Sequence, residues 1–304
     1  MSNEIDPLTI ADTEPNKALT WTVSGDVPAG VTASEDANGM TYTLSGAPAK
    51  WGDYSFSVIA SNAKGSDDVK VSVIVYTAPV LSDDAEIKAV KGSAMSQTFP
   101  AISGNHLVWT LSGDLPSGLS VSSDDNSFTV SGTPSTAGDY SFNLKAANMA
   151  GSDDIAVNIT VYEMPLLPDS IITVEAVKDF ALTEQNVTAT AGNYLTWSVD
   201  GTLPAGITVY SEDNAMTATI MGTPTAAGDY DFSIVAGNYA GSSSIEVSAI
   251  VYEAPEISGS SAEIQAVEGR ALNAREIAVT AGNHLTWTRT GTLPDGLTFS
   301  GTDS

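Results

Sequence analysis

The clearest pattern in this chain is a series of short runs in which apolar and polar residues alternate. Between residues 155 and 161, for example, Ile, Val, Ile and Val occupy every second position. A period of two is typical of a β-strand that buries one face. The runs are bounded by Gly, Pro, Asn and Asp residues, which favour turns. The pattern therefore predicts strands joined by tight turns.

Residues 78–163 contain the fullest set of such runs. They predict seven strands, near residues 86–91, 95–102, 107–111, 119–121, 128–130, 138–144 and 155–162. A Trp lies on the third predicted strand and a Tyr near the start of the sixth. Seven short strands with aromatic residues at these places indicate an all-β, immunoglobulin-like sandwich.

The same unit recurs along the chain. Trp21, Trp109, Trp197 and Trp287 are spaced 88, 88 and 90 residues apart, and a Pro-x-Gly turn follows each of them. Self-similarity of this kind indicates one structural unit copied in tandem. The expected units are repeat 1 at residues 1–77, with its first strand missing, repeat 2 at 78–163, repeat 3 at 164–253 and a partial repeat 4 at 254–304.

Further motifs follow the Trp in a constant order. In repeat 2 they are Ser-Gly-Thr-Pro at 131–134, Ala-Gly-Asp-Tyr at 137–140 and Asn-x-x-Gly-Ser at 148–152. Together these motifs resemble the "putative Ig" repeats of bacterial surface proteins, which belong with the dystroglycan-type cadherin-like domains. The resemblance implies tandem seven-stranded sandwiches, three complete or nearly complete and one half-repeat. It also implies spacing or adhesion, in modules that are attached to many different proteins.

The chain has no cysteine, so each sandwich must rely on its apolar core alone. The Gly-Asp-Tyr-x-Phe motif resembles the end of strand F in an antibody domain, with a Phe in place of the second disulfide cysteine. We expect the Trp of each repeat to pack against that ring. The expected core residues are Trp21, Trp109, Trp197, Tyr54, Tyr140, Tyr230, Phe56, Phe142 and Phe232.

The formal net charge is −26, from 11 Lys and Arg against 37 Asp and Glu, spread over all repeats. Such a surface repels nucleic acid and anionic lipid, so we expect neither nucleic-acid binding nor direct membrane insertion. The first residues lack the basic and apolar regions of a secretory signal. We interpret the chain as a piece of a longer extracellular or cell-surface protein, whose signal and anchor lie outside it. Cytoplasmic residence is the alternative.

The two histidines are not predicted to be catalytic bases. His106 and His284 lie three residues before the Trp of their repeats, where the other copies have Ala18 and Tyr194. A position whose residue changes between copies of one unit does not carry shared chemistry. No Ser/His/Asp arrangement can be assembled, and there are too few His and Cys residues for a metal site of that type. We expect no enzyme and no catalytic residue.

Calcium is the one cofactor to consider, because Ca²⁺ prefers oxygen ligands and the turns are rich in acids. The acids differ between copies, however, and Ser242–Ser244 stand where the earlier repeats have Ser-Asp-Asp. Asx-turns are the other explanation of these side chains, and the one we favour. The calcium candidates are Asp83, Asp84, Asp124, Asp125, Asp153, Asp154 and Asp213.

The array favours a non-catalytic stalk or adhesin segment that gives length and spacing to a bacterial surface protein. One alternative is a module of a secreted enzyme that binds a carbohydrate or a host protein. Another is a fibre subunit that assembles with itself, because another chain could complete repeat 4 by strand addition. The expected partners are therefore the same chain or a surface receptor or glycan. If no strand is added, we expect the end of the chain to be poorly ordered.

Overall fold

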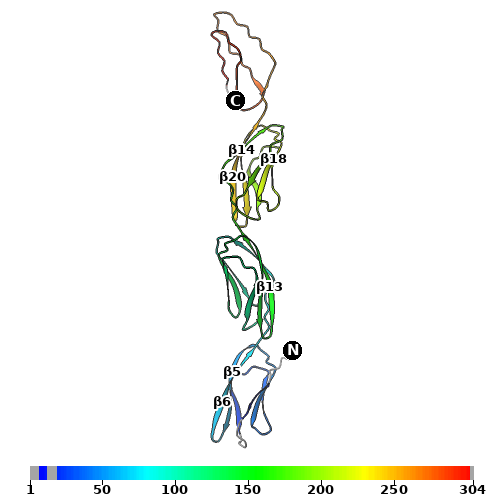
Figure 1. The fold of residues 1–304 in the computed structure, drawn as a ribbon, viewed down its shortest axis with the longest axis vertical. Helices are drawn as coiled ribbons and strands as arrows, with labels where there is room; N and C mark the ends of the chain where they lie inside the picture. Colours follow the sequence, from blue (N-terminus) through cyan, green and yellow to red (C-terminus); the bar gives the residue numbers. More distant parts are fainter. Residues whose placement is uncertain (1–6, 12–18, 302–304) are drawn as a thin grey trace. The chain divides into compact units, whose positions relative to one another are not determined.

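The computed structural model describes residues 7–11 and 19–301, which form β-strands joined by turns and loops (Figure 1). The described residues contain no helix, so the predicted all-β fold is confirmed. Accordingly, no described helix has the length and apolar character needed to cross a membrane. Ala18, which we compared with the histidines, lies outside the described residues.

Repeat 3 contains seven strands in two sheets. They are β14 Ile172–Val177, β15 Gln185–Thr188, β16 Thr196–Gly201, β17 Ile207–Tyr210, β18 Thr217–Gly222, β19 Gly228–Asn238 and β20 Gly241–Tyr252. The sheets have the strand orders β15-β18-β17 and β14-β20-β19-β16. β14 pairs with β20 in parallel, whereas β15–β18, β17–β18, β16–β19 and β19–β20 are antiparallel.

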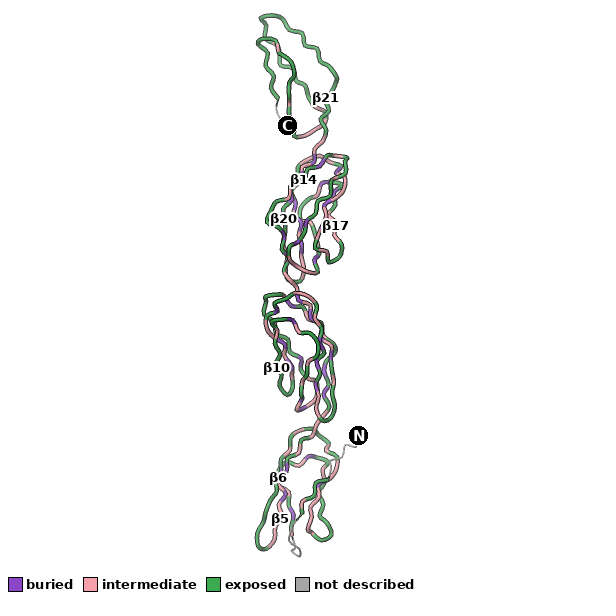
Figure 2. The backbone as a smooth tube through the Cα atoms, in the orientation of Figure 1, coloured by how far each residue is buried: buried purple, intermediate pink, exposed green. Residues whose placement is uncertain are grey.

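Alternate residues from both sheets form the core of repeat 3. Val187 and Ile220 come from one sheet, and Phe232, Ile234 and Val247 come from the other. All five side chains are buried, and Figure 2 shows such residues as purple segments within the strands. Because each sheet buries only one face, the buried apolar residues recur at every second position, as at 245, 247, 249 and 251 of β20.

Repeat 2 has the same arrangement. Its strands are β7 Ala85–Val90, β8 Met95–Pro100, β9 Val108–Gly113, β10 Leu119–Ser123, β11 Ser127–Gly132, β12 Gly138–Asn148 and β13 Gly151–Tyr162. The sheets have the orders β10-β11-β8 and β7-β13-β12-β9. Each of the seven strands expected here is present, and the Ig-like strand arrangement is confirmed.

The expected partner of the Trp in repeat 2 was wrong. In the register of β9 with β12, Trp109 lies opposite Ala146, whereas Phe142 lies opposite Gly113. Four residues of strand separate the two positions by about 13 Å, so the rings of Trp109 and Phe142 cannot stack. The Trp109 ring instead faces Phe128 of the other sheet, with ring centroids 6.0 Å apart. Phe142 packs beneath Gly113, where an added Cβ would lie 2.8 Å from the Phe142 Cα.

The other expected core residues differ in how far they are buried. The buried ones are Trp21, Phe56, Phe142 and Phe232, and the half-buried ones are Trp109, Trp197, Tyr54, Tyr140 and Tyr230. The hydroxyl of Tyr54 donates to the carbonyl of Lys50 at 3.0 Å, and that of Tyr230 donates to the carbonyl of Ala226 at 3.3 Å. These tyrosines therefore pack with their rings and hold the loop before their own strand with their hydroxyls.

Repeat 1 contains six described strands. They are β1 Leu8–Ala11, β2 Thr20–Gly25, β3 Val31–Glu35, β4 Thr41–Gly46, β5 Gly52–Asn62 and β6 Gly65–Val75. The sheets have the orders β1-β4-β3 and β2-β5-β6. β1 pairs antiparallel with β4, just as β8 pairs antiparallel with β11 in repeat 2. β1 therefore takes the place that β8 has in repeat 2. Among the described residues, no strand lies beside β6 in the place that β14 takes beside β20.

Repeat 4 contains two short described strands, β21 Glu256–Ile257 and β22 Val279–Ala281, which pair with each other. Residues 263–267 resemble residues 86–90 of the first strand of repeat 2, but they form no strand. In repeat 3 the equivalent segment is held by parallel pairing with β20. The described residues of repeat 4 provide no such strand, and the segment lies exposed.

Substitution of Trp109 tests the corrected packing. Its indole N–H donates to the carbonyl of Asp124 at 2.9 Å. Trp109→Phe keeps a ring beside Phe128 but loses this bond, and should lower the local free energy of unfolding by about 1 kcal/mol. Trp109→Ala also loses the ring and should cost about 3 kcal/mol. Amide hydrogen exchange in β9 and β12 measures both losses. Equal losses in the two variants would contradict the packing described.

The matched control is Val108→Ala, the neighbouring residue on β9. Its side chain is 65% exposed, so the change should alter the same free energy by less than about 0.5 kcal/mol.

Candidate functional site

A pair of asparagines lies where repeat 2 is followed by repeat 3. Asn193 accepts a hydrogen bond from the backbone N–H of Glu163 at 2.8 Å, and its Nδ2 donates to the carbonyl of Val161 at 3.1 Å. Asn238 donates through Nδ2 to the carbonyls of Glu163 and Asn193, at 2.7 and 2.8 Å. We call this pair of side chains the asparagine clamp. It holds the backbone directly after β13.

The clamp recurs after β6. Asn105 accepts a hydrogen bond from the N–H of Thr77 at 3.0 Å and donates to the carbonyl of Val75 at 3.1 Å. Asn148 donates to the carbonyls of Thr77 and Asn105, at 2.7 and 2.9 Å. Asn105 is only 8% exposed, so its side chain needs these partners.

The first asparagine of the clamp also recurs after β20. Asn283 accepts from the N–H of Glu253 at 2.8 Å and donates to the carbonyl of Val251 at 2.9 Å. At all three junctions the side chain binds one N–H and one C=O at the end of the last strand. Backbone groups that leave a sheet need such partners, so the clamp completes the pairing of each last strand.

A glycine directly before the first asparagine of each clamp lets the loop approach the linker closely. Gly192 has a φ of +115°, and an added Cβ would lie 3.1 Å from the Cα of Pro165. For Gly104 the corresponding distance, to the Cα of Pro79, is 3.0 Å. Both the positive φ and the close contact favour glycine. The sequence signal is Gly-Asn-x-Leu-x-Trp at residues 104–109, 192–197 and 282–287. Our predictions used only its Trp and the residue three positions before the Trp.

The residue after Asn105, Asn193 and Asn283 also has a positive φ, and after two of these three asparagines it is a histidine. Nε2 of His106 lies 2.7 Å from Oδ1 of Asp53, and Nε2 of His284 lies 2.8 Å from Oδ1 of Asp229. Both aspartates belong to the Gly-Asp-Tyr motif of the preceding repeat. The histidines therefore add a second polar contact at these two junctions.

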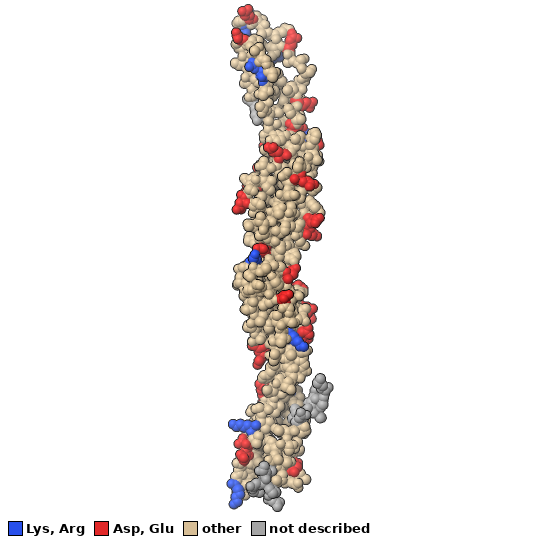
Figure 3. Space-filling model, viewed as in Figure 1, with Lys and Arg blue, Asp and Glu red and all other residues tan. Residues whose placement is uncertain are grey.

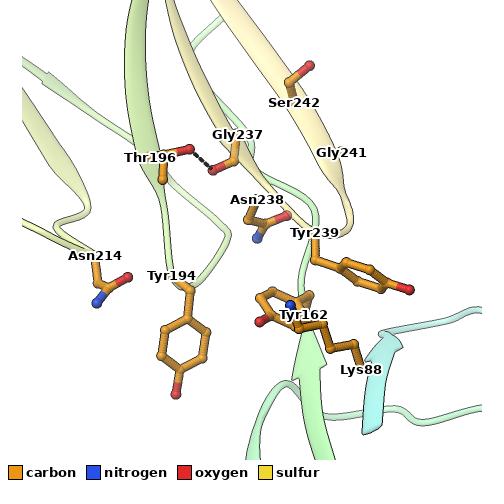
Figure 4. A pocket seen from close by; sticks show the side chains of 10 residues that line it. All are labelled: Lys88, Tyr162, Tyr194, Thr196, Asn214, Gly237, Asn238, Tyr239, Gly241 and Ser242. Carbon is orange, nitrogen blue, oxygen red and sulfur yellow. Dashed lines mark hydrogen bonds between the residues drawn. The ribbon is translucent and has the colours of Figure 1, made fainter. Parts of the chain in front are cut away.

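Between repeats 2 and 3 the same position is a tyrosine, and three tyrosines gather there (Figure 4). The ring of Tyr162 has its centroid 5.8 Å from that of Tyr194 and 5.2 Å from that of Tyr239. Nζ of Lys88 lies 5.6 Å from the Tyr239 centroid, within cation–π range. We call the open surface depression lined by these four residues the tyrosine hollow. Its rings offer faces on which a sugar or a peptide could stack.

Several calcium candidates accept hydrogen bonds from the backbone. Oδ2 of Asp153 accepts from the N–H of Leu81, and Oδ1 of Asp84 accepts from the N–H of Ala156, both at 2.8 Å. The candidates with exposed side chains are Asp83, Asp84, Asp124, Asp125, Asp154 and Asp213. Within residues 7–11 and 19–301, no three or more His, Cys, Asp or Glu residues are grouped so that they could hold a metal ion. The structure therefore does not bring these candidates together as one ligand set.

Asp124 forms an Asx-turn at the tip of the β10–β11 hairpin. Its Oδ1 accepts from the backbone N–H groups of Asn126 and Ser127, at 2.8 and 2.7 Å. The bond from Asn126 is the main cause that lowers the pKa of the Asp124 carboxyl. Asp36 is bonded in a similar way at the tip of the β3–β4 hairpin, and its pKa is also lowered. Both carboxylates are thus used to close turns.

Lysine–glutamate pairs connect the end of a first strand with the following linker. Lys178 follows β14 and donates to Oε1 of Glu253, and Lys91 donates to Oε1 of Glu163 in the same way. The bond from Lys178 lowers the pKa of the Glu253 carboxyl, and the same bond raises the pKa of Lys178. The charged forms of both partners are therefore favoured in the folded protein.

The sequence profile of a family described as "Putative Ig domain" matches residues 78–162 and 166–252, together more than half of the chain. The chain belongs to this Ig-domain family. Four clamp asparagines lie within the parts that match the Ig-domain profile: Asn105, Asn148, Asn193 and Asn238. No curated protein sequence matches the chain.

Solved structures of tandem Ig domains are similar to this chain. The I-band fragment I67–I69 from titin has a TM-score of 0.51 and 16% identity, over 81% of this chain and 92% of that one. Titin domains A168–A170 have a TM-score of 0.38 and 16% identity, over 80% and 97% of the two chains. The endo-fucoidan hydrolase MfFcnA4 has a TM-score of 0.31 and 22% identity, over 82% of this chain and 42% of that chain. The first likeness shows a tandem Ig-like fold.

Replacing Asn193 tests the clamp. Asn193→Ala removes both side-chain bonds and should raise the exchange rate of the Glu163 amide at least about tenfold. Asn193→Asp keeps the acceptor oxygen and should protect this amide better than alanine does. Asn186→Ala, at an exposed position on β15, is the control and should leave the amide unchanged. The clamp would be refuted if both Asn193 variants exchanged like the wild type.

The Lys178–Glu253 pair predicts a dependence of stability on pH. The pKa of Glu253 is lowered in the folded protein. The contribution of this carboxylate to the free energy of unfolding is therefore present above about pH 4.3, and it is lost as the pH falls through the lowered pKa. The pKa of Lys178 is raised in the folded protein. The contribution of this ammonium group to the free energy of unfolding is therefore present below about pH 10.4, and it is lost as the pH rises through the raised pKa. Glu253→Gln should therefore be less stable than the wild type at pH 7. Denaturant titrations should show this difference shrinking towards pH 3, and a difference independent of pH would contradict the role of the pair.

Proposed function

We propose that this chain is a non-catalytic segment of a bacterial surface protein, in which the repeats form a stalk or adhesin-type spacer outside the cell. The observation that carries this proposal is the recurrence of the clamp bonds after β6, β13 and β20. A contact repeated at every junction serves a property that grows with the number of repeats, such as length. A catalytic or binding centre needs to be built only once.

The short linkers support the proposal, because they have few bonds free to rotate. The clamp binds the residue directly after the tyrosine that ends β13 or β20, and a proline follows two residues later, at Pro165 and Pro255. Proline fixes its own φ, and the clamp restrains the backbone before it. Linkers of this kind would resist bending, as a spacer requires.

The surface charge supports the proposed location and the absence of nucleic-acid partners. The face drawn in Figure 3 carries acidic side chains along the chain and few basic ones, in agreement with the net charge of −26. Like charge keeps separate molecules soluble and repels nucleic acids and anionic membranes. A spacer outside the cell would benefit from both effects.

A second candidate function is binding of a carbohydrate or a host protein, and the tyrosine hollow is the observation that favours it. Tyr239 is 58% exposed and lies beside Lys88, so an aromatic face and a cation are both available to a ligand. Against this reading, the hollow depends on Tyr194 and Tyr239, whose equivalents in repeat 2 are His106 and Met149. The spacer contacts recur, whereas the hollow occurs at one junction.

Small-angle X-ray scattering tests the spacer function. The variant with Asn105, Asn193 and Asn283 all changed to Ala should show a broader distribution of interatomic distances than the wild type, because its linkers bend. Asn186→Ala should scatter like the wild type. If the triple variant kept its repeats folded and still scattered like the wild type, the proposal would have to be abandoned.

A glycan array and a host-protein array separate the two candidate functions. The spacer function predicts no saturable binding by the wild type. A saturable signal that disappears in Tyr194→Ala and Tyr239→Ala, and persists in Tyr210→Ala, would instead establish the ligand-binding module. Tyr210 is a suitable control because it is 57% exposed and lies outside the hollow.

A further inference from the structure

The tip of the β3–β4 hairpin in repeat 1 carries the only Asn-Gly dipeptide of the chain, at Asn38 and Gly39. Asn38 is exposed, and Gly39 has a φ of +67°. Apart from its two chain neighbours, no described atom lies within 4 Å of the place that a Cβ on Gly39 would take. The backbone nitrogen between the two residues therefore has open space around it.

An asparagine followed by glycine carries a reaction of its own. Asparagine is among the thermolabile residues. The backbone nitrogen of the next residue can attack the side-chain carbonyl carbon Cγ of the asparagine. A side chain on that next residue hinders the approach, and glycine has none. The dipeptide at the hairpin tip thus combines an exposed electrophile with the least hindered nucleophile.

We propose that Asn38 is a site of spontaneous deamidation. The nitrogen of Gly39 forms a bond to Cγ of Asn38, the bond from Cγ to Nδ2 breaks, and Nδ2 leaves as ammonia with the proton of the Gly39 nitrogen. The product is a five-membered succinimide ring. Water then opens this ring. Opening at Cγ gives aspartate, whereas opening at the main-chain carbonyl carbon of residue 38 gives isoaspartate.

One hydrogen bond slows the reaction without preventing it. The N–H of Gly39 donates to the carbonyl of Asp36 at 3.0 Å, and this bond must open before the nitrogen can attack. The bond lies at the tip of a hairpin, where local opening costs little free energy. The attack therefore proceeds from an opened tip while the sheets of repeat 1 stay folded.

Repeat 3 contains a matched position that lacks the glycine. Asn214 is exposed at the tip of the β17–β18 hairpin, and the N–H of Ala215 donates to the carbonyl of Glu212 at 3.2 Å. The exposure of the asparagine and the bond across the turn are thus shared with repeat 1. The next residue differs, and the Cβ of Ala215 hinders the attack. Asn214 should therefore deamidate far more slowly than Asn38.

The modification reaches the core of repeat 1 through Trp21. The indole N–H of Trp21 donates to the carbonyl of Gly39 at 3.0 Å, and this tryptophan is only 8% exposed. In isoaspartate the main chain runs through Cβ and Cγ, so one extra carbon separates the Cα of residue 38 from the Gly39 nitrogen. The Gly39 carbonyl then moves away from the indole. A buried donor loses its acceptor, which lowers the free energy of unfolding of repeat 1.

The extra carbon also disturbs the turn. Oδ1 of Asp36 accepts hydrogen bonds from the N–H groups of Met40 and Thr41, at 2.7 and 3.0 Å, and these bonds span the modified linkage. Aspartate at position 38 leaves the length of the main chain unchanged and keeps the bonds. The two products therefore carry the same charge but differ in their effect, and isoaspartate is the one that loosens repeat 1 as the molecule ages.

Mass spectrometry of the aged chain tests the site. The full chain is incubated at mildly alkaline pH, which favours loss of the proton from the attacking nitrogen, and is digested with trypsin at intervals. The peptide of residues 18–50, whose one asparagine is Asn38, should accumulate the mass gain of a deamidation. Labelling by an isoaspartate methyltransferase should identify part of the product as isoaspartate. Fragment ions that contain Asn214 should show far less of the mass gain.

Two variants are matched controls for the reaction. Gly39→Ala places a methyl group where no described atom beyond the chain neighbours lies within 4 Å, and should slow the mass gain to the rate of Asn214. Asn38→Gln keeps an amide but moves its carbonyl carbon one bond further from the nitrogen, and should abolish the mass gain. The mass of the peptide reports on both variants whether or not the turn keeps its conformation.

NMR of the indole N–H groups tests the effect on the core. In the isoaspartate form the Trp21 indole N–H should exchange with solvent at least about tenfold faster than in fresh protein. Asn38→Asp carries the new charge without the extra carbon and should exchange like fresh wild type. The indole of Trp197, which donates to the carbonyl of Ala215 at 2.9 Å, is the internal control and should keep its rate.

Two results would overturn the proposal. The site would be refuted if Asn38 gained mass no faster than Asn214 and Gly39→Ala changed nothing. The effect on the core would be refuted if the Trp21 indole of the isoaspartate form exchanged like that of fresh protein. Neither result bears on the spacer function, which is tested by the clamp asparagines.

Discussion

The last strand of each repeat carries the hydrogen bonds on which the rest of the structure depends. In repeat 3, β20 pairs with β14 on one edge and with β19 on the other, and it buries Ile245 and Val247 in the core. Beyond its end, the linker is bonded to Asn283 of the next repeat. Because sheet, core and linker all use one strand, a change in that strand affects the sandwich and its junction together. The alternation that β13 and β20 share reflects these combined demands.

Local patterns were enough to predict the strands, but not which of them would find partners. Every second residue from 155 to 161 in β13 and from 245 to 251 in β20 is apolar and buried, so the period of two identifies both strands directly. Residues 262–267 have the local pattern of β7, yet they form no strand, because a strand also needs an edge to pair with. The register of β9 with β12 likewise decides that Trp109 faces Phe128 and not Phe142. Residue types alone do not encode that register.

The junctions were harder to predict than the sandwiches. The clamp asparagines resemble ordinary turn residues, and the partners of Asn193 lie about thirty residues earlier in the chain. The repeated Gly-Asn pair was the available signal, because a side chain at the glycine would come too close to the proline of the linker. The carboxylates were easier to interpret, since Asx-turns at hairpin tips depend only on neighbouring residues, as Asp124 shows. Local polar contacts could thus be predicted, whereas contacts across a junction could not.

The parallel pairing of first and last strands has a mechanical consequence. The chain enters repeat 3 through β14 and leaves it through β20, and the two strands run in the same direction. Tension on the two ends of the repeat therefore pulls these strands in opposite directions along their common axis. Their hydrogen bonds are loaded in shear and must break together, whereas an antiparallel hairpin pulled from its open end loses them one at a time.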